Sequence, residues 1–438
     1  MTRLRPTELS FLLSFFLWAF GALPALCSQV EPVTVGQTVR VAPPRLTEGM
    51  EFNDVSLCDT LSLRPAPVQS TLFADSLPVV KHAPRWFRQW LSSLIRGNVD
   101  HTRDKPLDLS FAVSPSYTRE ASFGIGGAAT ALYRMNRNDT LKSPSDVFAS
   151  VNISINGFFV VTFKGNNLFP DNRSRLSYNL ELYRKSLDFW GVNSEETARN
   201  PTSHYDRRQI DLKAEYVYRI YRNIYLGAQM RLDYTEARTI RNPEYLLGER
   251  PRYYVTGLGA SVALDSRDNI LNPTRGVYLM YKALFYPHWL GNAPHYFMSQ
   301  HLICDAYIGL WKGAVLGLDY YFGVNTDKTP WTMREQIASD GIRMRGYYMG
   351  EAIDNSQIAA QIELRQHVYK RFGVVGWVGG ATLFSSIKDY TTKNIRPEWL
   401  HNFGLGLRFE FKHNVNARVD FGWGQGTKGL VFAIGEAF

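Results

Sequence analysis

From about residue 107 to the end of the chain, hydrophobic and polar residues alternate with a period of two. In one segment, Val151, Ile153 and Ile155 alternate with asparagine and serine. The same alternation returns at 176–182, 210–216, 226–233 and 405–412. A period of two is typical of β-strands with one apolar and one polar face. Charged residues would be costly in the core of a soluble sandwich, so the pattern favours strands with lipid outside and water inside.

The pattern therefore predicts an all-β fold, a transmembrane antiparallel β-barrel of sixteen strands over residues 106–438. An even strand number suits closure with both ends on one side of the membrane. Long connections are expected on one side of the barrel, at 184–208, 237–252, 326–355 and 385–399. Short connections are expected on the other side, near residues 222, 311–313, 369–373 and 412–416. The alternative is a soluble, secreted all-β protein.

The first 28 residues have the pattern of an export signal peptide. Arg3 and Arg5 precede the apolar stretch 11–23, and small residues follow near Cys27. Residues 29–105 are expected to form an extended periplasmic leader, because they are rich in proline. Lipidation of Cys27 is left open.

One amphipathic helix is predicted within the leader, at about 84–97. Its apolar face carries Trp86, Phe87, Trp90 and Leu91, and arginines lie opposite. Such a helix suits the membrane interface, and docking of a soluble partner is the alternative.

Composition and missing motifs argue against several classes of function. The net charge is +9, but the basic residues are scattered, which argues against nucleic-acid binding. No apolar run after residue 30 is long enough for a membrane helix. Motifs of hydrolases, metalloproteases and phosphate loops are missing, so we predict neither catalysis nor a cofactor or metal.

Two internal motifs resemble those of the bacterial surface antigen superfamily, the outer-membrane barrels of the BamA/TamA kind. The segment 264–279 is similar to the family's conserved turn, through Asp265, Arg267, Asp268, Asn269, Pro273, Arg275 and Gly276. The segment 344–347, Met-Arg-Gly-Tyr, resembles the family's Val-Arg-Gly-Tyr/Phe loop motif. The closing strands are similar as well.

The resemblance implies that a long loop folds back into the barrel and that Arg345 pairs with acids on the inner wall. Alternation in the next strand turns Glu363 inward, so Glu363 is the expected partner. Gly346 would let the loop turn beside the wall. Where the family has a second inward acid, this chain has Val378 before two glycines. The resemblance therefore implies that the loop is held by Glu363 alone, or by hydrogen bonds of Tyr347.

The end of the chain suggests the compartment. Within residues 429–438, Leu430, Phe432 and Ile434 lie on one face, and the last strand is expected to end at Phe438. A terminal aromatic residue resembles the insertion signal of bacterial outer-membrane barrels, and an interfacial girdle residue is the alternative. Both interpretations predict the outer membrane of a Gram-negative bacterium.

The resemblance is to a short member of the superfamily without POTRA domains. It implies assembly and insertion of outer-membrane proteins, or polypeptide translocation, with lipid and client polypeptides as partners. A periplasmic chaperone-like or assembly protein would take the place of the POTRA domains. The first and last strands, 111–117 and 430–438, would pair weakly and open sideways. A passive channel and a barrel hydrolase are the alternatives.

Overall fold

The computed structural model describes residues 84, 105–118, 122–135, 144–170, 173–339, 341–386, 398–412 and 414–438. They belong to one compact unit, Gln69–Phe438. The predicted signal peptide, Cys27, and Trp86, Phe87, Trp90 and Leu91 of the predicted helix lie outside the described residues.

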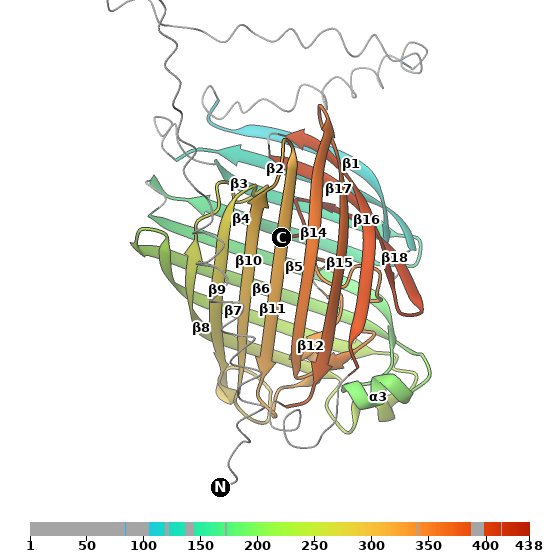
Figure 1. The fold of residues 1–438 in the computed structure, drawn as a ribbon. Helices are drawn as coiled ribbons and strands as arrows, with labels where there is room; N and C mark the ends of the chain where they lie inside the picture. The colour runs from blue at the N-terminus through green and yellow to red at the C-terminus, as the bar shows by residue number, and fades with distance from the viewer. Residues whose placement is uncertain are drawn as a thin grey trace, which may run out of the picture. The chain divides into compact units, whose positions relative to one another are not determined.

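The described residues form one antiparallel sheet of sixteen strands in chain order, which confirms the predicted strand number and barrel (Figure 1). The strands of the first half are β1 (Asp108–Thr118), β2 (Ser122–Tyr133), β3 (Ser145–Ser154), β4 (Phe159–Leu168), β5 (Ser174–Phe189), β6 (Ser203–Tyr221), β7 (Ile224–Arg238) and β8 (Arg252–Asp265). Those of the second half are β9 (Gly276–Tyr286), β10 (Phe297–Gly309), β11 (Ala314–Asn325), β14 (Ser356–Tyr369), β15 (Phe372–Phe384), β16 (Leu400–Lys412), β17 (Val415–Gly424) and β18 (Thr427–Ile434).

The two faces of the sheet follow the alternation seen in the sequence. On β14, Ile362 and Leu364 are exposed on the outer face, whereas Gln361 and Glu363 are buried. Because successive strand residues point to opposite faces, the apolar set faces lipid and the polar set faces the interior.

The connections predicted to be long lie at one end of the barrel and those predicted to be short lie at the other, because the strands alternate in direction. The long ones span 190–202, 239–251, 326–355 and 385–399. They hold α3 (Ser194–Arg199), the 3-10 helices η3 (Pro243–Leu246) and η5 (Trp331–Met333), and the two-residue strands β12 (Glu335–Gln336) and β13 (Ile353–Asp354). A further 3-10 helix, η4 (His288–Leu290), follows β9.

The first two long connections are shorter than predicted. β5 has 16 residues and β6 has 19, more than the ~9–11 that a membrane strand needs. Their extra length is stabilised by apolar packing, since Leu187, Phe189 and Tyr205 join a buried cluster with Trp331 of the long loop. Local alternation weakens in this part of the sequence, where tertiary packing extends the strands.

The sheet begins with β1 and ends with β18, and these two strands lie side by side. No hydrogen-bonded register joins them among the described residues. We call this junction the seam. The prediction that the last strand ends on Phe438 is wrong, because β18 ends at Ile434 and Gly435 turns the chain with a φ of +99°.

Among the described residues, no helix has both the length and the apolar character required of a membrane span.

Candidate functional site

The connection between β11 and β14 folds into the barrel interior, and we call residues 326–355 the long loop. Its buried side chains include Trp331, Ile337 and Met344, none of them more than 2% exposed. Ile337 and Met344 pack with Ala359 and Ala381, which belong to the inner wall on β14 and β15. Apolar contact with the wall therefore holds the loop inside the barrel independently of any ion pair.

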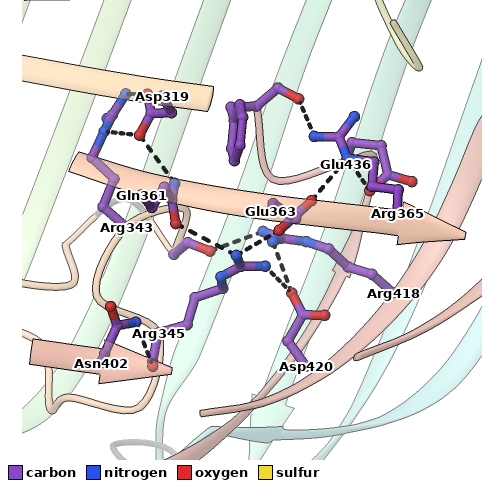
Figure 2. Close-up of polar contacts among 12 residues, drawn as sticks. Asp319, Arg343, Arg345, Gln361, Glu363, Arg365, Asn402, Arg418, Asp420 and Glu436 are labelled. Atoms are coloured by element: carbon purple, nitrogen blue, oxygen red, sulfur yellow. Dashed lines mark hydrogen bonds and ion pairs between the residues drawn. The ribbon is translucent and has the colours of Figure 1, made fainter. Parts of the chain in front are cut away.

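Arg345 lies near the tip of this loop, between two carboxylates of the wall (Figure 2). Its Nη2 atom is 2.6 Å from Oε2 of Glu363 on β14, and its Nη1 atom is 2.8 Å from Oδ2 of Asp420 on β17. The guanidinium also lies 3.7 Å from the ring centre of Trp377 on β15. All three charged side chains are almost completely buried, so these contacts form in a dry environment. We call Arg345, Glu363 and Asp420 the Arg345 site.

Further arginines share the same carboxylates. Arg365 Nε lies 2.8 Å from Glu363 Oε1, and Arg408 Nη1 lies 2.5 Å from Asp420 Oδ1. Arg418 Nη1 lies 3.1 Å from Asp420 Oδ2. Removing one member of such a buried network leaves its partners uncompensated, which is costly.

The backbone around Arg345 is in direct contact with the wall. Gly346 has a φ of +114°, and a Cβ atom there would lie 2.7 Å from the carbonyl carbon of Gly422 on β17. Only a residue without a side chain adopts this conformation at so short a distance without strain. Gly346 therefore allows the turn that the sequence led us to expect, and Gly422 provides the space for it.

Hydrogen bonds attach the loop tip to the last three strands. Asn402 Nδ2 on β16 donates to the Arg345 carbonyl oxygen at 3.1 Å, and Thr427 Oγ1 on β18 donates to the Gly346 carbonyl oxygen at 3.1 Å. The Tyr347 hydroxyl donates to the carbonyl oxygen of His401 and accepts from the Gln425 backbone amide, each at 2.9 Å. The loop is thus tied to the last strands of the sheet, of which β18 borders the seam.

Two details of the sequence interpretation are wrong. Glu363 does not hold Arg345 alone, since Asp420 is a second acidic partner. Val378 is not an inward position either, because its side chain is exposed on the outer face. The inward neighbour is Trp377, whose ring contacts Arg345. In the sequence, Arg418 and Asp420 alternate with Val419 and Phe421. This alternation predicts that Asp420 faces the interior, so it could have identified the second acidic partner.

A second arginine of the loop makes a separate contact. Arg343 binds Asp319 on β11 through two bonds, Nε to Oδ2 at 2.8 Å and Nη2 to Oδ1 at 2.5 Å. Gln361 Nε2 donates to Oδ2 of the same aspartate at 3.0 Å. Asp305 on β10 is the register partner of Asp319, so two acids are adjacent here. Arg343 compensates the charge of Asp319, and no sequence motif had pointed to Arg343.

We expect Arg343→Gln to destabilise the barrel by about 2 kcal/mol, since Asp319 then loses two charge-assisted bonds and keeps its contact with Gln361. Chemical unfolding in detergent micelles measures the change. Combining the substitution with Asp319→Asn should cost less than the sum of the two single changes. Additive costs would show that the two side chains do not interact.

The turn motif lies at the short-turn end, between β8 and β9. Asp265 accepts from Arg267 Nε at 3.0 Å and from Nη2 at 3.1 Å, and it also accepts from Arg175 Nη1 on β5 at 2.7 Å. Gly276 has a φ of +110°, at the point where the chain enters β9. These contacts fix the turn to the wall, and they do not reach the Arg345 site.

Asp268 organises the rest of this turn. Its Oδ1 atom accepts from the backbone amides of Asn269, Thr274 and Arg275, and Oδ2 accepts from the Thr274 hydroxyl. Partial burial acts to raise the pKa of Asp268, but these hydrogen bonds outweigh it and hold the pKa below its usual value. Pro273 is buried in the same turn. The motif residues thus act together in shaping one turn.

Phe438 lies against the inner wall instead of the lipid-facing girdle. Its carbonyl oxygen accepts from Arg365 Nη2 at 2.7 Å, and its ring centre lies 6.1 Å from that of Tyr307. Arg408 Nε donates to Glu436 Oε2 at 2.8 Å, two residues earlier. Buried arginines therefore draw the end of the chain inward. The use of Phe438 as an insertion signal stays a prediction.

Within the described ranges, no three histidine, cysteine, aspartate or glutamate side chains form a group suited to a metal ion.

A sixteen-stranded antiparallel barrel with an apolar outer face and a charged, loop-filled interior defines an outer-membrane β-barrel protein. Residues 137–438 match the model of the Omp85 superfamily domain. That match spans more than half of the chain, so the chain belongs to the Omp85 superfamily. No curated protein matches it by sequence.

Several solved structures resemble the fold at low identity. BamA from Haemophilus ducreyi lacking POTRA domains 1–3 is 11% identical with a TM-score of 0.47, over 74% of this chain and 70% of that chain. CdiB from Escherichia coli is 11% identical with a TM-score of 0.48, over 75% and 63%. CdiB from Acinetobacter baumannii is 12% identical with a TM-score of 0.45, over 76% and 60%. This chain thus spans less than two thirds of either CdiB chain.

Proposed function

We propose that this barrel inserts polypeptides into the outer membrane or passes them across it, and that it has no catalytic activity. In this proposal the seam between β1 and β18 opens sideways, and a client strand adds to the exposed edge. The Arg345 site restrains the opening while the long loop is in place.

The attachment of the loop tip to β16, β17 and β18 is the observation that carries the proposal. Arg345 contacts Asp420 on β17, and Thr427 on β18 binds the backbone of Gly346. Any movement of β18 away from β1 therefore strains the loop contacts, and release of the loop removes one restraint on the seam. A long loop folded into the interior is a poor feature for a passive channel, because it takes up space that the solute would cross.

The partners proposed are outer-membrane lipid, client polypeptides and a periplasmic chaperone-like or assembly protein. The leader supplies one candidate contact for them. Its predicted helix, with Trp86, Phe87, Trp90 and Leu91, would lie at the membrane interface, and docking of the delivery partner is the alternative.

Photo-crosslinking at the seam tests the proposal. A photoreactive residue at Phe111 on β1 or Phe432 on β18, both exposed on the outer face, should trap polypeptides in native membranes. The matched control is Leu258 on β8, which is equally lipid-facing but distant from the seam in the sheet order. Equal polypeptide adducts at all three positions, or none at any, would overturn the proposal.

A mild-detergent pull-down followed by mass spectrometry tests the partners. The wild-type chain should retain a periplasmic protein or trapped clients, and Arg345→Ala should alter that set. A lone barrel in both samples, together with steady large conductance of the wild-type chain in planar bilayers, would favour a passive channel.

A further inference from the structure

A cavity of about 500 Å³ opens at the short-turn end of the barrel. It is bordered by the turns at 310–313 and 370–371, by residues 272–275 and by the ends of the adjoining strands. Its volume lies in the range that holds an organic ligand instead of a single ion. The cavity is separate from the Arg345 site, although two arginines of the network lie in its wall.

The lining of this cavity carries more cationic than acidic side chains, although Arg365 and Arg408 also pair with acids of the Arg345 network. Among the described residues, two acids, Glu410 and Glu436, line it. Five cationic side chains face them, those of Arg275, Lys312, Arg365, Arg371 and Arg408. Arg275 and Lys312 are exposed at the rim, whereas Arg365 and Arg408 are buried. The excess of cations favours an anionic ligand.

Two arginines of the wall also have part of their hydrogen bonding unsatisfied. Arg365 and Arg408 are 6% and 5% exposed, and Nη1 of the first and Nη2 of the second have no hydrogen-bond partner within the described part of the chain. The Arg408 Nη2 atom lies 3.9 Å from Glu363, which is too far for a hydrogen bond. Buried donors without a partner are rare, and the oxygens of an anion are the acceptors that suit guanidinium groups best.

The outer edge of the cavity is apolar. Leu310, Trp311 and Val374 line it and are exposed on the lipid-facing side of the wall. The indole Nε1 of Trp311 donates to Gln366 at 2.8 Å, so the ring is fixed at this edge. Tryptophan at the end of a membrane strand marks the headgroup level of the bilayer. The cavity therefore runs from an apolar outer edge to a cationic wall.

We propose that this cavity binds the phosphate headgroup of an anionic phospholipid from the leaflet that surrounds the short turns. The cationic groups contact the phosphate, and the apolar edge contacts the start of the acyl chains. A soluble phosphate would use the cations alone and would leave the apolar edge without a role. The inference is independent of whether the barrel handles polypeptides.

Native mass spectrometry of the full chain in detergent tests the inference. The probes are short-chain phosphatidylglycerol, short-chain phosphatidylcholine and inorganic phosphate. We expect phosphatidylglycerol to bind in preference to the other two. Arg275→Gln/Lys312→Gln should weaken its binding about tenfold, because two cations near the headgroup are removed. Heat-dependent gel migration shows that each variant is folded, and Lys312→Gln alone should give a smaller loss in the same direction.

The matched control is Arg219→Gln/Arg222→Gln, which removes two cations from the same end of the barrel but outside the cavity. It should leave phosphatidylglycerol binding unchanged. Equal loss in both double variants, or no loss in either, would overturn the site. Inorganic phosphate that binds as tightly as the lipid, with the same dependence on Arg275 and Lys312, would assign the cavity to a soluble anion and overturn the lipid source.

Discussion

Arg345→Ala should lower the free energy of unfolding by about 3 to 5 kcal/mol, because Glu363 and Asp420 stay buried after their shared guanidinium is removed. The arginine side chain is 0% exposed. Water therefore cannot solvate the two carboxylates in its place without a free-energy cost. Chemical unfolding in micelles, followed by tryptophan fluorescence, measures the loss. Limited proteolysis should also cut the long loop faster in the variant.

Two further variants control this experiment. Arg345→Lys keeps the charge, but one ammonium cannot reproduce the two-sided contact to Glu363 and Asp420, so we expect only partial recovery. Lys328→Ala removes an exposed cation from the same loop and should change stability by less than about 0.5 kcal/mol. If Arg345→Ala unfolds at the same denaturant concentration as Lys328→Ala, the buried ion pairs contribute nothing to stability.

Gly422→Ala should displace the loop tip without changing any charge. The added Cβ atom would overlap the carbonyl oxygen of Arg345 and lie 3.0 Å from the amide nitrogen of Gly346. Because these are backbone atoms, no side-chain rotation relieves the overlap. We expect a stability loss of up to about 3 kcal/mol and faster proteolysis of residues 341–355.

Gly376→Ala on β15 is the matched control for this substitution. Its added Cβ atom would have Leu405 Cδ2 as its nearest neighbour, at 3.6 Å, which is an ordinary van der Waals contact. This variant should keep wild-type proteolysis of the loop. Equal cleavage rates in Gly422→Ala and Gly376→Ala would contradict the close approach of the loop to β17.

Alternation in the sequence was sufficient to predict the strands, their number and the lipid-facing side, because a strand has a strict period of two and a membrane leaves one face apolar. It also placed Glu363 on the inner wall. The family resemblance, by contrast, was off by one residue at Val378, and a shift of one position moves a side chain to the opposite face. There, the inward position belongs to Trp377.

The end of the last strand could not be predicted from alternation. Residues 435–438 follow β18 directly in the chain, but Gly435 turns them away from the sheet and Arg365 binds Phe438 inside the barrel. The partner that draws them inward lies more than 70 residues earlier in the chain. No local pattern contains that information.

The sequence by itself determined the barrel, its polar interior and the presence of an arginine near the tip of a long loop. Only the tertiary structure decided that Arg345 lies between Glu363 and Asp420, that Arg343 binds Asp319, and that the loop tip is attached to β16, β17 and β18. Strand periodicity is set by neighbouring residues. The partners of a buried charge are set by the folded barrel, in which Glu363 on β14 and Asp420 on β17 reach the same guanidinium. Each carboxylate then compensates the buried positive charge, so the loss of any one of these groups leaves the others unpaired.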